Sequence, residues 1–388
     1  LTHSWPLIEQ FPLWGTGYGT FRYVEPIYMH TAADVGSIYL HAHNDYLEDL
    51  IEGGIVRLLL RVLAIGLIFW FAYRAVRFSH RWRASALALG TLFGFTTVVV
   101  HSFFEFGLYT PAIAVVATVL VAHICSQNDR THDPVDNGAA AGHRSTIAPL
   151  IGIVLAVFTG GFLVREAAIA ASADGVRKKA RQDYDDAFVD GIYQATETPI
   201  LQQSIRLAPL DAERRFELAR ALFNLHQQQV RLAELFPDRA DPVPKQLIVD
   251  ALEHTLAARD LCPLLPQPHA RIAHYHKHLK NADPHEAYIE RVTMLAPADP
   301  GLWYLCGLQE LNDGDQRSAW HSWRQSLKLS DEYLRQIIDR ATLYVTPDEM
   351  QSSLLPDEPA ILLEVSQYLY PEDDSTAERE PFLSRALA

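Results

Sequence analysis

The sequence predicts an all-α protein in which a polytopic transmembrane helical bundle is followed by an external α-solenoid. Two observations lead to this fold class. Between residues 55 and 164, the chain of 388 residues contains four apolar runs of about 19 to 21 residues. From about residue 167 onward the composition is polar, acidic and rich in helix formers, with no alternation of apolar and polar residues that would indicate strands.

The four apolar runs are the expected membrane spans. Each is long enough to cross about 30 Å of hydrocarbon as a helix that rises about 1.5 Å per residue. A buried helix of a large soluble protein is the alternative, but four such runs, three of them in close succession, argue against it. The runs cover residues 55–73, 84–104, 107–125 and 146–164.

Arginines set the expected orientation of these spans. The loop between the first two spans carries Arg74, Arg77, Arg81 and Arg83. Because basic loops stay on the cytoplasmic side, we expect cytoplasmic loops near residues 74–83 and 126–145. Residues 1–54 then form an external, periplasmic loop, and residues 167–388 form an external domain. The expected location is the bacterial inner membrane, crossed several times.

The start of the chain also carries information. Leu1 is not a start methionine, and no signal peptide precedes the first segment. An external loop at this position needs an upstream span to place it outside. We therefore expect the chain to be the C-terminal part of a longer polytopic protein.

Composition argues against two classes of protein. The formal net charge is −14, so there is no surplus of cations to displace phosphate counterions, and we expect no nucleic-acid partner. Three cysteines cannot form a disulfide framework, although a single external disulfide between Cys262 and Cys306 stays open.

The external domain is expected to consist of helix pairs. Pro263 and Pro297 are 34 residues apart, which is the period of a tetratricopeptide repeat, whereas Pro209 and Pro263 are 54 residues apart. Residues 301–330 fit one helix pair. We therefore expect three or four imperfect pairs in an interrupted α-solenoid, with a non-repeating helical bundle as the alternative. Solenoids present a concave binding face, and here this face would recruit a protein partner.

The first 54 residues hold the unusual chemistry. A glycine ladder, Gly15, Gly17 and Gly19, precedes Arg22. The ladder is not a phosphate-binding P-loop, because no helix with a Lys-Ser or Lys-Thr pair follows it. A close-packed turn is the simpler interpretation of these glycines.

A short helix is expected to follow His43 and Asn44. Asp45 with Glu48 fits a capping box, and the pair of glycines at 53–54 fits a helix stop. His43 would then lie just before the helix N-terminus, where the positive end of the dipole keeps the imidazole neutral and able to accept a proton. The same helix end is a favourable position for an anion.

Metal binding is not expected at this loop. His41 and His43 form a His-x-His pair, but no third ligand lies nearby at a convincing spacing. We therefore expect no metal site and no cofactor.

His101 and Glu105 lie one helical turn apart at the expected external end of the second span. Ionisable residues at the edge of a membrane are costly and often functional. The pair therefore lines a substrate path or forms a structural hydrogen bond near the interface.

In combination, these motifs resemble the O-antigen ligase and polymerase family, bacterial glycosyltransferases that use undecaprenyl-diphosphate-linked glycans. The family signature is His, then Asn, Ser or Arg, then nine residues and Gly-x-x-Gly. His43, Asn44 and Gly54 match it, whereas Arg57 replaces the last glycine. The Pro-x-x-Gly-x-Gly-x-Gly-x-Phe stretch at residues 12–21 and the His-Ser-x-Phe-x-Phe stretch from residue 101 also match. The resemblance covers roughly residues 1–125.

The resemblance implies metal-independent transfer of a lipid-linked glycan to an acceptor hydroxyl with inversion at the anomeric carbon. It places the catalytic histidine at His43, as a general base or hydrogen-bond acceptor for the attacking hydroxyl. The leaving diphosphate needs cations or N–H donors. The family's key arginine would fall upstream of Leu1, and Arg22 is the nearest visible substitute, with Arg57 another. The residues expected to bind substrate are Gly15, Gly17, Gly19, Arg22, Asn44 and His101.

Several functional alternatives stay open. The acceptor is a lipid or a protein, so the subclass lies between a lipopolysaccharide ligase, a polysaccharide polymerase and a protein O-oligosaccharyltransferase. A tetratricopeptide-like domain fused at the C-terminus is common among relatives. The non-enzymatic alternative is a membrane-anchored tetratricopeptide scaffold in the assembly of cell-envelope polysaccharide.

Overall fold

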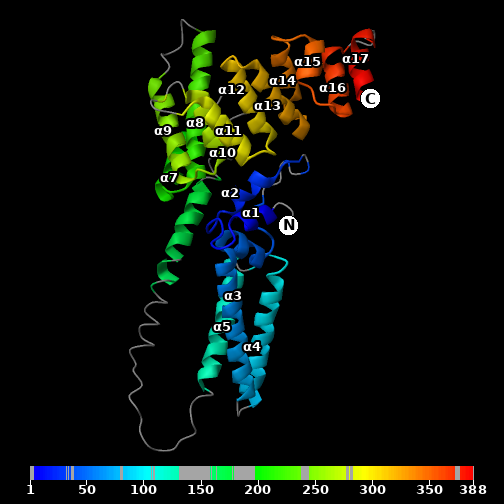
Figure 1. Cartoon of the computed structure of the whole chain (residues 1–388). Coiled ribbons are helices and arrows are strands. Elements are labelled where there is room, and N and C mark those ends of the chain that lie inside the picture. The colour runs from blue at the N-terminus through cyan, green and yellow to red at the C-terminus, as the bar shows by residue number, and fades with distance from the viewer. Residues whose placement is uncertain are drawn as a thin grey trace, which may run out of the picture. The chain divides into compact units, whose positions relative to one another are not determined.

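All the regular elements that the computed structural model describes are helical (Figure 1). The contacts divide the chain into two compact units, residues 1–142 and 143–388, each described by itself below. The structure describes residues 4–31, 33, 35, 39–78, 82–105, 107, 110–130, 158, 160–162, 164–176, 178, 197–236, 244–276, 279, 283–371 and 376–387.

The first unit begins with short helices and continues into three long ones. The short helices are α1 (Trp5–Gln10), α2 (Phe21–Val24) and the 3-10 helix η1 (Glu25–Tyr28). The long helices are α3 (Asp45–Arg77), α4 (Trp82–His101) and α5 (Pro111–Arg130). These three coincide with the first three apolar runs of the sequence, although α4 ends three residues before the predicted limit at residue 104.

Membrane-spanning character is clearest for α3. Among the described helices it is the one long and apolar enough to cross a membrane, while the apolar stretches Ser85–His101 and Ala112–Ser126 are shorter. Only 6% of the apolar window of α3 is buried, so α3 is not the core helix of a soluble protein. Most of the fourth predicted span, residues 146–164, lies outside the described residues.

The three long helices pack side by side (Figure 1). Ala72, Phe95 and Ile124, one from each helix, form the buried contact between them. The outward faces carry exposed apolar side chains: Leu59, Leu60, Leu63 and Leu67 on α3, Leu89 and Phe93 on α4, and Val115 and Val119 on α5. Such a continuous apolar surface is unfavourable in water and suits contact with lipid.

The second unit consists of successive helices that pack in pairs. Contacts join α8 with α9, α10 with α11, α12 with α13 and α16 with α17. The helices are α7 (Glu197–Leu207), α8 (Ala212–Leu235), α9 (Lys245–Leu261), α10 (Pro266–Tyr275), α11 (His285–Leu295), α12 (Pro300–Asn312), α13 (Gln316–Leu329), α14 (Leu334–Ala341), α15 (Pro347–Ser353), α16 (Pro359–Leu369) and α17 (Thr376–Leu387).

Helix starts in this unit follow the sequence closely. The side chains of Asp211, Asp299 and Asp315 accept a hydrogen bond from a backbone N–H in the first turn of α8, α12 and α13. The pair α12–α13 spans the stretch predicted as one helix pair. Two small residues let these helices meet closely: a Cβ at Gly307 would lie 2.3 Å from the ring of Trp323, and Ala319 is fully buried.

The two cysteines of the second unit are not joined in this fold. Cys262 and Cys306 form no disulfide, so the pairing considered from the sequence is not the one that the structure has. Cys306 is buried in the cluster formed by α10, α11 and α12, and burial raises the pKa of its thiol. Its environment is that of a packing residue.

Candidate functional site

The loop before α3 places His43 next to Glu105. The Nδ1 atom of His43 lies 3.3 Å from Oε2 of Glu105, just beyond the end of α4. Both side chains are open to solvent, at 60% and 50% exposure. His43 has a φ of +48°, the one positive φ of a non-glycine residue in the described part of the chain. A strained backbone at a polar, accessible residue is typical of a functional site.

Asn44 fixes the start of α3. Its Oδ1 accepts hydrogen bonds from the N–H groups of Tyr46 and Leu47, each at 3.0 Å. Asn44 is therefore the N-cap, and the predicted capping box between Asp45 and Glu48 is wrong. Asn44 rather than Asp45 caps the helix, because an amide oxygen immediately before the first helical residue reaches two backbone N–H groups of the first turn.

Glu48 instead anchors the loop that carries His43. Its Oε2 accepts from the N–H of Ala42 at 3.0 Å, and its Oε1 lies 3.0 Å from Nδ1 of His41. The Glu48 side chain is 2% exposed, so these contacts are shielded from water. The His-x-His pair is thereby split: His41 turns toward the buried carboxylate, while His43 turns toward Glu105.

The start of α3 also docks against the end of α4. The N–H of Asp45 donates to the carbonyl oxygen of Ser102 at 2.9 Å, and the hydroxyl of Tyr46 donates to that of Val99 at 2.8 Å. The rings of Tyr46 and Phe103 lie 4.3 Å apart. These contacts bring His43 and Glu105 together although they are 62 residues apart in sequence.

A break in α3 lies about two turns further along the helix. Gly54 has a φ of +63°, and α3 resumes directly after it. The N–H of Ile55 donates to the carbonyl oxygen of Pro12 at 2.9 Å, and that of Val56 donates to Leu13 at 3.4 Å. The predicted glycine stop is thus a kink within a longer helix.

The glycine ladder supplies hydrogen-bond donors to the carbonyl groups that precede this break. The N–H of Thr16 donates to the carbonyl oxygen of Ile51, and the N–H of Gly17 donates to that of Glu52, both at 2.9 Å. In an unbroken helix those two carbonyls would accept from residues 55 and 56. Segment 12–17 therefore replaces four backbone partners that α3 loses at the kink.

Close approach explains some of the glycines and not others. A Cβ at Gly15 would lie 2.3 Å from the carbonyl carbon of Glu52, and one at Gly54 would lie 2.3 Å from that of Leu13. Gly19 has a φ of +73° but has nothing within 4 Å of a Cβ. Gly15 is thus a packing residue, whereas Gly19 lies in an open part of the turn.

Arg57 and Arg61 lie on one face of α3, after the kink. Nε of Arg57 is 2.8 Å from Oδ1 of the fully buried Asp49, and Nη1 is 3.1 Å from Oε2 of Glu52. Arg61 contacts the other carboxylate oxygen of Asp49. The guanidinium of Arg57 also lies 4.8 Å from the ring centroid of Tyr18, in the glycine ladder. Arg57 therefore joins the ladder to α3.

The other predicted site residues have different surroundings. Arg22 is exposed, and its guanidinium lies 4.5 Å from the ring centroid of Tyr23. His101 is the last residue of α4 and is exposed. Glu105 closes a turn on the backbone of His101, yet its carboxylate pairs with His43. The sequence placed Glu105 with the wrong histidine, because contacts between distant segments leave no local pattern.

A cavity of about 360 Å³ lies among α3, α4 and α5. Its lining is apolar except for four side chains: Tyr46, Arg61, Ser102 and Thr118. Nη1 of Arg61 is buried and has no hydrogen-bond partner among the described residues. Tyr46 and Ser102 belong both to this cavity and to the contact that positions His43.

The arrangement suits proton transfer at an exposed surface. A carboxylate accepts hydrogen bonds, so Glu105 orients the His43 imidazole with its N–H at Nδ1. The described residues at this loop hold no group of three metal-ligand side chains.

Comparison with known protein families gives a match at the start of the chain. No curated protein matches the chain significantly. The family described as O-antigen ligase matches residues 1–62, a segment that holds the glycine ladder, His43, Asn44 and the kink at Gly54. Members of that family are membrane-integral enzymes of the ligase or polymerase type. The first 62 of 388 residues are therefore similar to O-antigen ligases, in the same region where the structure assembles the His43 site.

Proposed function

We propose that the chain forms part of a membrane glycosyltransferase of the O-antigen ligase type, which transfers an undecaprenyl-diphosphate-linked glycan to an acceptor hydroxyl. The observation that carries this proposal is the His43–Glu105 pair. His43 lies within the matched residues 1–62, and the docking of α3 against α4 brings Glu105 to it. The enzyme would be a multi-pass protein of the inner membrane, with residues 1–54 on the external side.

His43 is the proposed general base. With Nδ1 directed to Glu105, Nε2 is the ring nitrogen that would accept the proton of the attacking hydroxyl. The carboxylate would stabilise the imidazolium that forms as the hydroxyl attacks the anomeric carbon. The bond to the diphosphate then breaks on the opposite face, which gives inversion without a metal ion or a nucleotide cofactor.

The donor would contact three kinds of groups. Arg22 would supply positive charge and the backbone N–H of Gly19 a hydrogen-bond donor for the diphosphate, whereas the N–H of Gly17 already donates to Glu52. The apolar cavity among α3, α4 and α5 suits the lipid tail, and Arg61, with its unpartnered Nη1, suits a phosphate at the tail's end. Asn44 and His101 would position the sugar and the acceptor.

The direct test replaces His43 with Ala in the full-length protein and measures transfer of the lipid-linked glycan. We expect a loss of at least about 100-fold, since general bases contribute about 10²–10⁴-fold. His30→Ala is the matched control, because His30 is an exposed histidine of the same unit with no assigned role. Normal transfer by His43→Ala at normal protein level would contradict the assignment of His43 as the general base.

Glu105 gives a graded second test. Glu105→Gln keeps the size of the side chain and removes the charge, so His43 stays in place but its imidazolium loses stabilisation. We expect a smaller fall in transfer than with His43→Ala, and no further fall when the two changes are combined. Additive losses in the double variant would contradict a shared role.

A further inference from the structure

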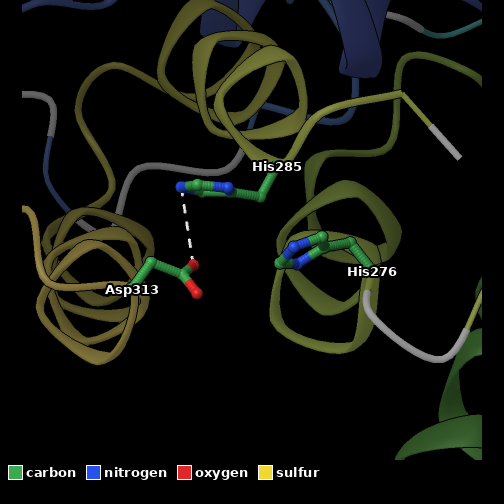
Figure 2. A group of neighbouring side chains, drawn as sticks. All are labelled: His276, His285 and Asp313. Carbon is green, nitrogen blue, oxygen red and sulfur yellow. Dashed lines mark ion pairs between the residues drawn. The ribbon is translucent and has the colours of Figure 1, made fainter.

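Three ligand-type side chains meet between two helix pairs of the second unit (Figure 2). His276 follows the last residue of α10, His285 is the first residue of α11, and Asp313 follows the last residue of α12. We propose that His276, His285 and Asp313 bind a divalent transition metal ion of the zinc type, at a site separate from the His43 loop.

Distances within the group are close to those of a bound site. One ligand atom from each residue lies within 4.8 Å of the other two. Nε2 of His285 is 3.4 Å from Oδ2 of Asp313, the contact drawn as a dashed line in Figure 2. Ligands about 2.0–2.2 Å from tetrahedral zinc are about 3.3 Å apart. The His285–Asp313 pair already has this spacing, and a change of the His276 side-chain rotamer would have to bring its ring nitrogen in from within 4.8 Å.

Neighbouring groups orient each ligand. Nδ1 of His276 donates to the carbonyl oxygen of Ala273 at 2.9 Å, which leaves the lone pair of Nε2 free to bind a cation. Nδ1 of His285 lies 3.4 Å from a carboxylate oxygen of Glu286. Metal-binding histidines almost always direct their other ring nitrogen to a carbonyl or carboxylate, and both histidines here do so.

Asp313 is supported in the same way. The amide nitrogen of Gln309 donates to Oδ2 of Asp313, and the amide oxygen of Gln309 lies 2.9 Å from Nδ1 of His274. Gln309 is buried, so this chain of hydrogen bonds fixes the carboxylate. Outer partners of this kind are what hold metal ligands in position.

Burial and ligand chemistry favour a transition metal. The side chains of His285 and Asp313 are 16% and 8% exposed, so an ion can enter but would be partly shielded from water. Two imidazole nitrogens and one carboxylate suit zinc or ferrous iron, whereas calcium and magnesium prefer oxygen ligands alone. Three protein ligands leave one position open for water.

The bound ion would join the ends of three helices. It would tie the end of α10 and the start of α11 to the end of α12, and so fix the packing of one helix pair on the next. The expected consequence is a more stable second unit when metal is present.

The test is a Zn²⁺ titration of the metal-free full-length protein in detergent, with a chromophoric chelator as competitor. We expect one tight site, at least about 10-fold weaker in His285→Ala and in Asp313→Asn. Because the chain has 17 histidines, His321→Ala, an exposed histidine on α13, is the matched control and should bind like the parent. Equal weakening in the control, or no weakening in either site variant, would overturn the proposal.

A second measurement does not depend on the variants folding. Zn²⁺ should protect His276 and His285 of the parent protein from carbethoxylation, as mapped by mass spectrometry, and leave His321 reactive. Unchanged modification of His276 and His285 in saturating Zn²⁺ would contradict the site. Since the His43 loop is not involved, glycan transfer by His43 variants and zinc binding should vary independently.

Discussion

At the residue scale, burial decides the protonation of Glu310. This glutamate lies on α12, and burial raises the pKa of its carboxyl to about 7, while Asp315 adds a repulsive charge. The hydroxyl of Ser322 donates to Oε2 at 2.7 Å and opposes the change only in part. Glu310 therefore gains a proton on folding at mildly acidic pH.

The sign of the pH dependence follows from this raised pKa. Below the ordinary glutamate pKa of about 4.5, both folded and unfolded chains hold the proton and the stabilising contribution is complete. It is lost as pH rises toward about 7, because only the unfolded carboxyl has ionised. The free energy of unfolding should therefore fall by up to about 3 kcal/mol over this range.

Glu310→Gln should remove most of this dependence. Urea unfolding of the protein, followed by tryptophan fluorescence at several pH values between 4.5 and 7.5, measures it. Glu332→Gln, an exposed glutamate beyond α13, is the control and should keep the parent slope. A slope unchanged in Glu310→Gln would show that another group titrates.

His43 shows what a single residue in a sequence can and cannot indicate. The position of His43 just before a helix was correctly predicted, and its neighbour Asn44 proved to be the N-cap of that helix. Its partner Glu105 was not identified, since the sequence paired Glu105 with His101. The spacing of four residues on a helix is visible in sequence, whereas a contact across 62 residues depends on how α3 docks against α4.

At the element scale, Gly15 and Gly54 make the kink of α3 possible, because both allow α3 and segment 12–17 to approach closely. A left-handed Gly54 frees two N–H groups and two carbonyls, and segment 12–17 satisfies all four. A backbone N–H or carbonyl that is removed from water without a partner costs about 1–3 kcal/mol, so the kink and the segment stabilise one another.

Substitutions at the glycines should distinguish two costs of an added Cβ: overlap with neighbouring atoms and an unfavourable positive φ. We expect Gly15→Ala and Gly54→Ala to destabilise the protein by at least about 3 kcal/mol, because a Cβ at either would overlap backbone atoms. Gly19→Ala meets no atom within 4 Å and should cost only about 1–2 kcal/mol for its left-handed backbone.

Thermal unfolding in detergent measures these differences. Gly66→Ala serves as the neutral control, since Gly66 is helical, with open space at its Cβ position. If Gly19→Ala proved as damaging as Gly15→Ala, the close contact between the ladder and α3 would not be the reason for the glycines.

Local signals set element limits only in part. The aspartates that cap α8, α12 and α13 directly precede their helices, whereas the capping box that the sequence predicts, Asp45 with Glu48, is replaced by the N-cap Asn44. The apolar runs gave α3, α4 and α5 by length and hydropathy alone. The predicted stop at residues 53–54 was incomplete, because segment 12–17 replaces the lost hydrogen bonds and allows α3 to resume.

At the scale of the whole molecule, the chain contains two units whose surfaces differ in polarity. The first carries exposed apolar side chains along three helices, while the second buries its apolar residues in clusters formed only by its own helices. The largest of these clusters joins α12 to α17 around Trp323 and Phe382. The composition of the whole chain, 49% hydrophobic and 21% charged residues, is therefore an average over a unit that suits lipid and a unit that suits water.

A fragment that begins at residue 164 should therefore fold by itself. We expect it to be soluble without detergent, helical by circular dichroism and cooperative in unfolding, because its described cores need no residue of the first unit. Residues 1–142 should require detergent, owing to their exposed leucines and valines. Aggregation of the second fragment in water would contradict the division.

The sequence by itself determined what depends on neighbours along the chain. Hydropathy gave the apolar helices, and the motif around His43 gave the similarity to O-antigen ligases. Only the tertiary structure decided which distant groups meet: His43 with Glu105, the glycine ladder with the kink of α3, and His276 with His285 and Asp313. The physical reason is that periodicity and hydrogen bonding within a helix are local, whereas docking between helices depends on the shapes of faces that no short pattern encodes.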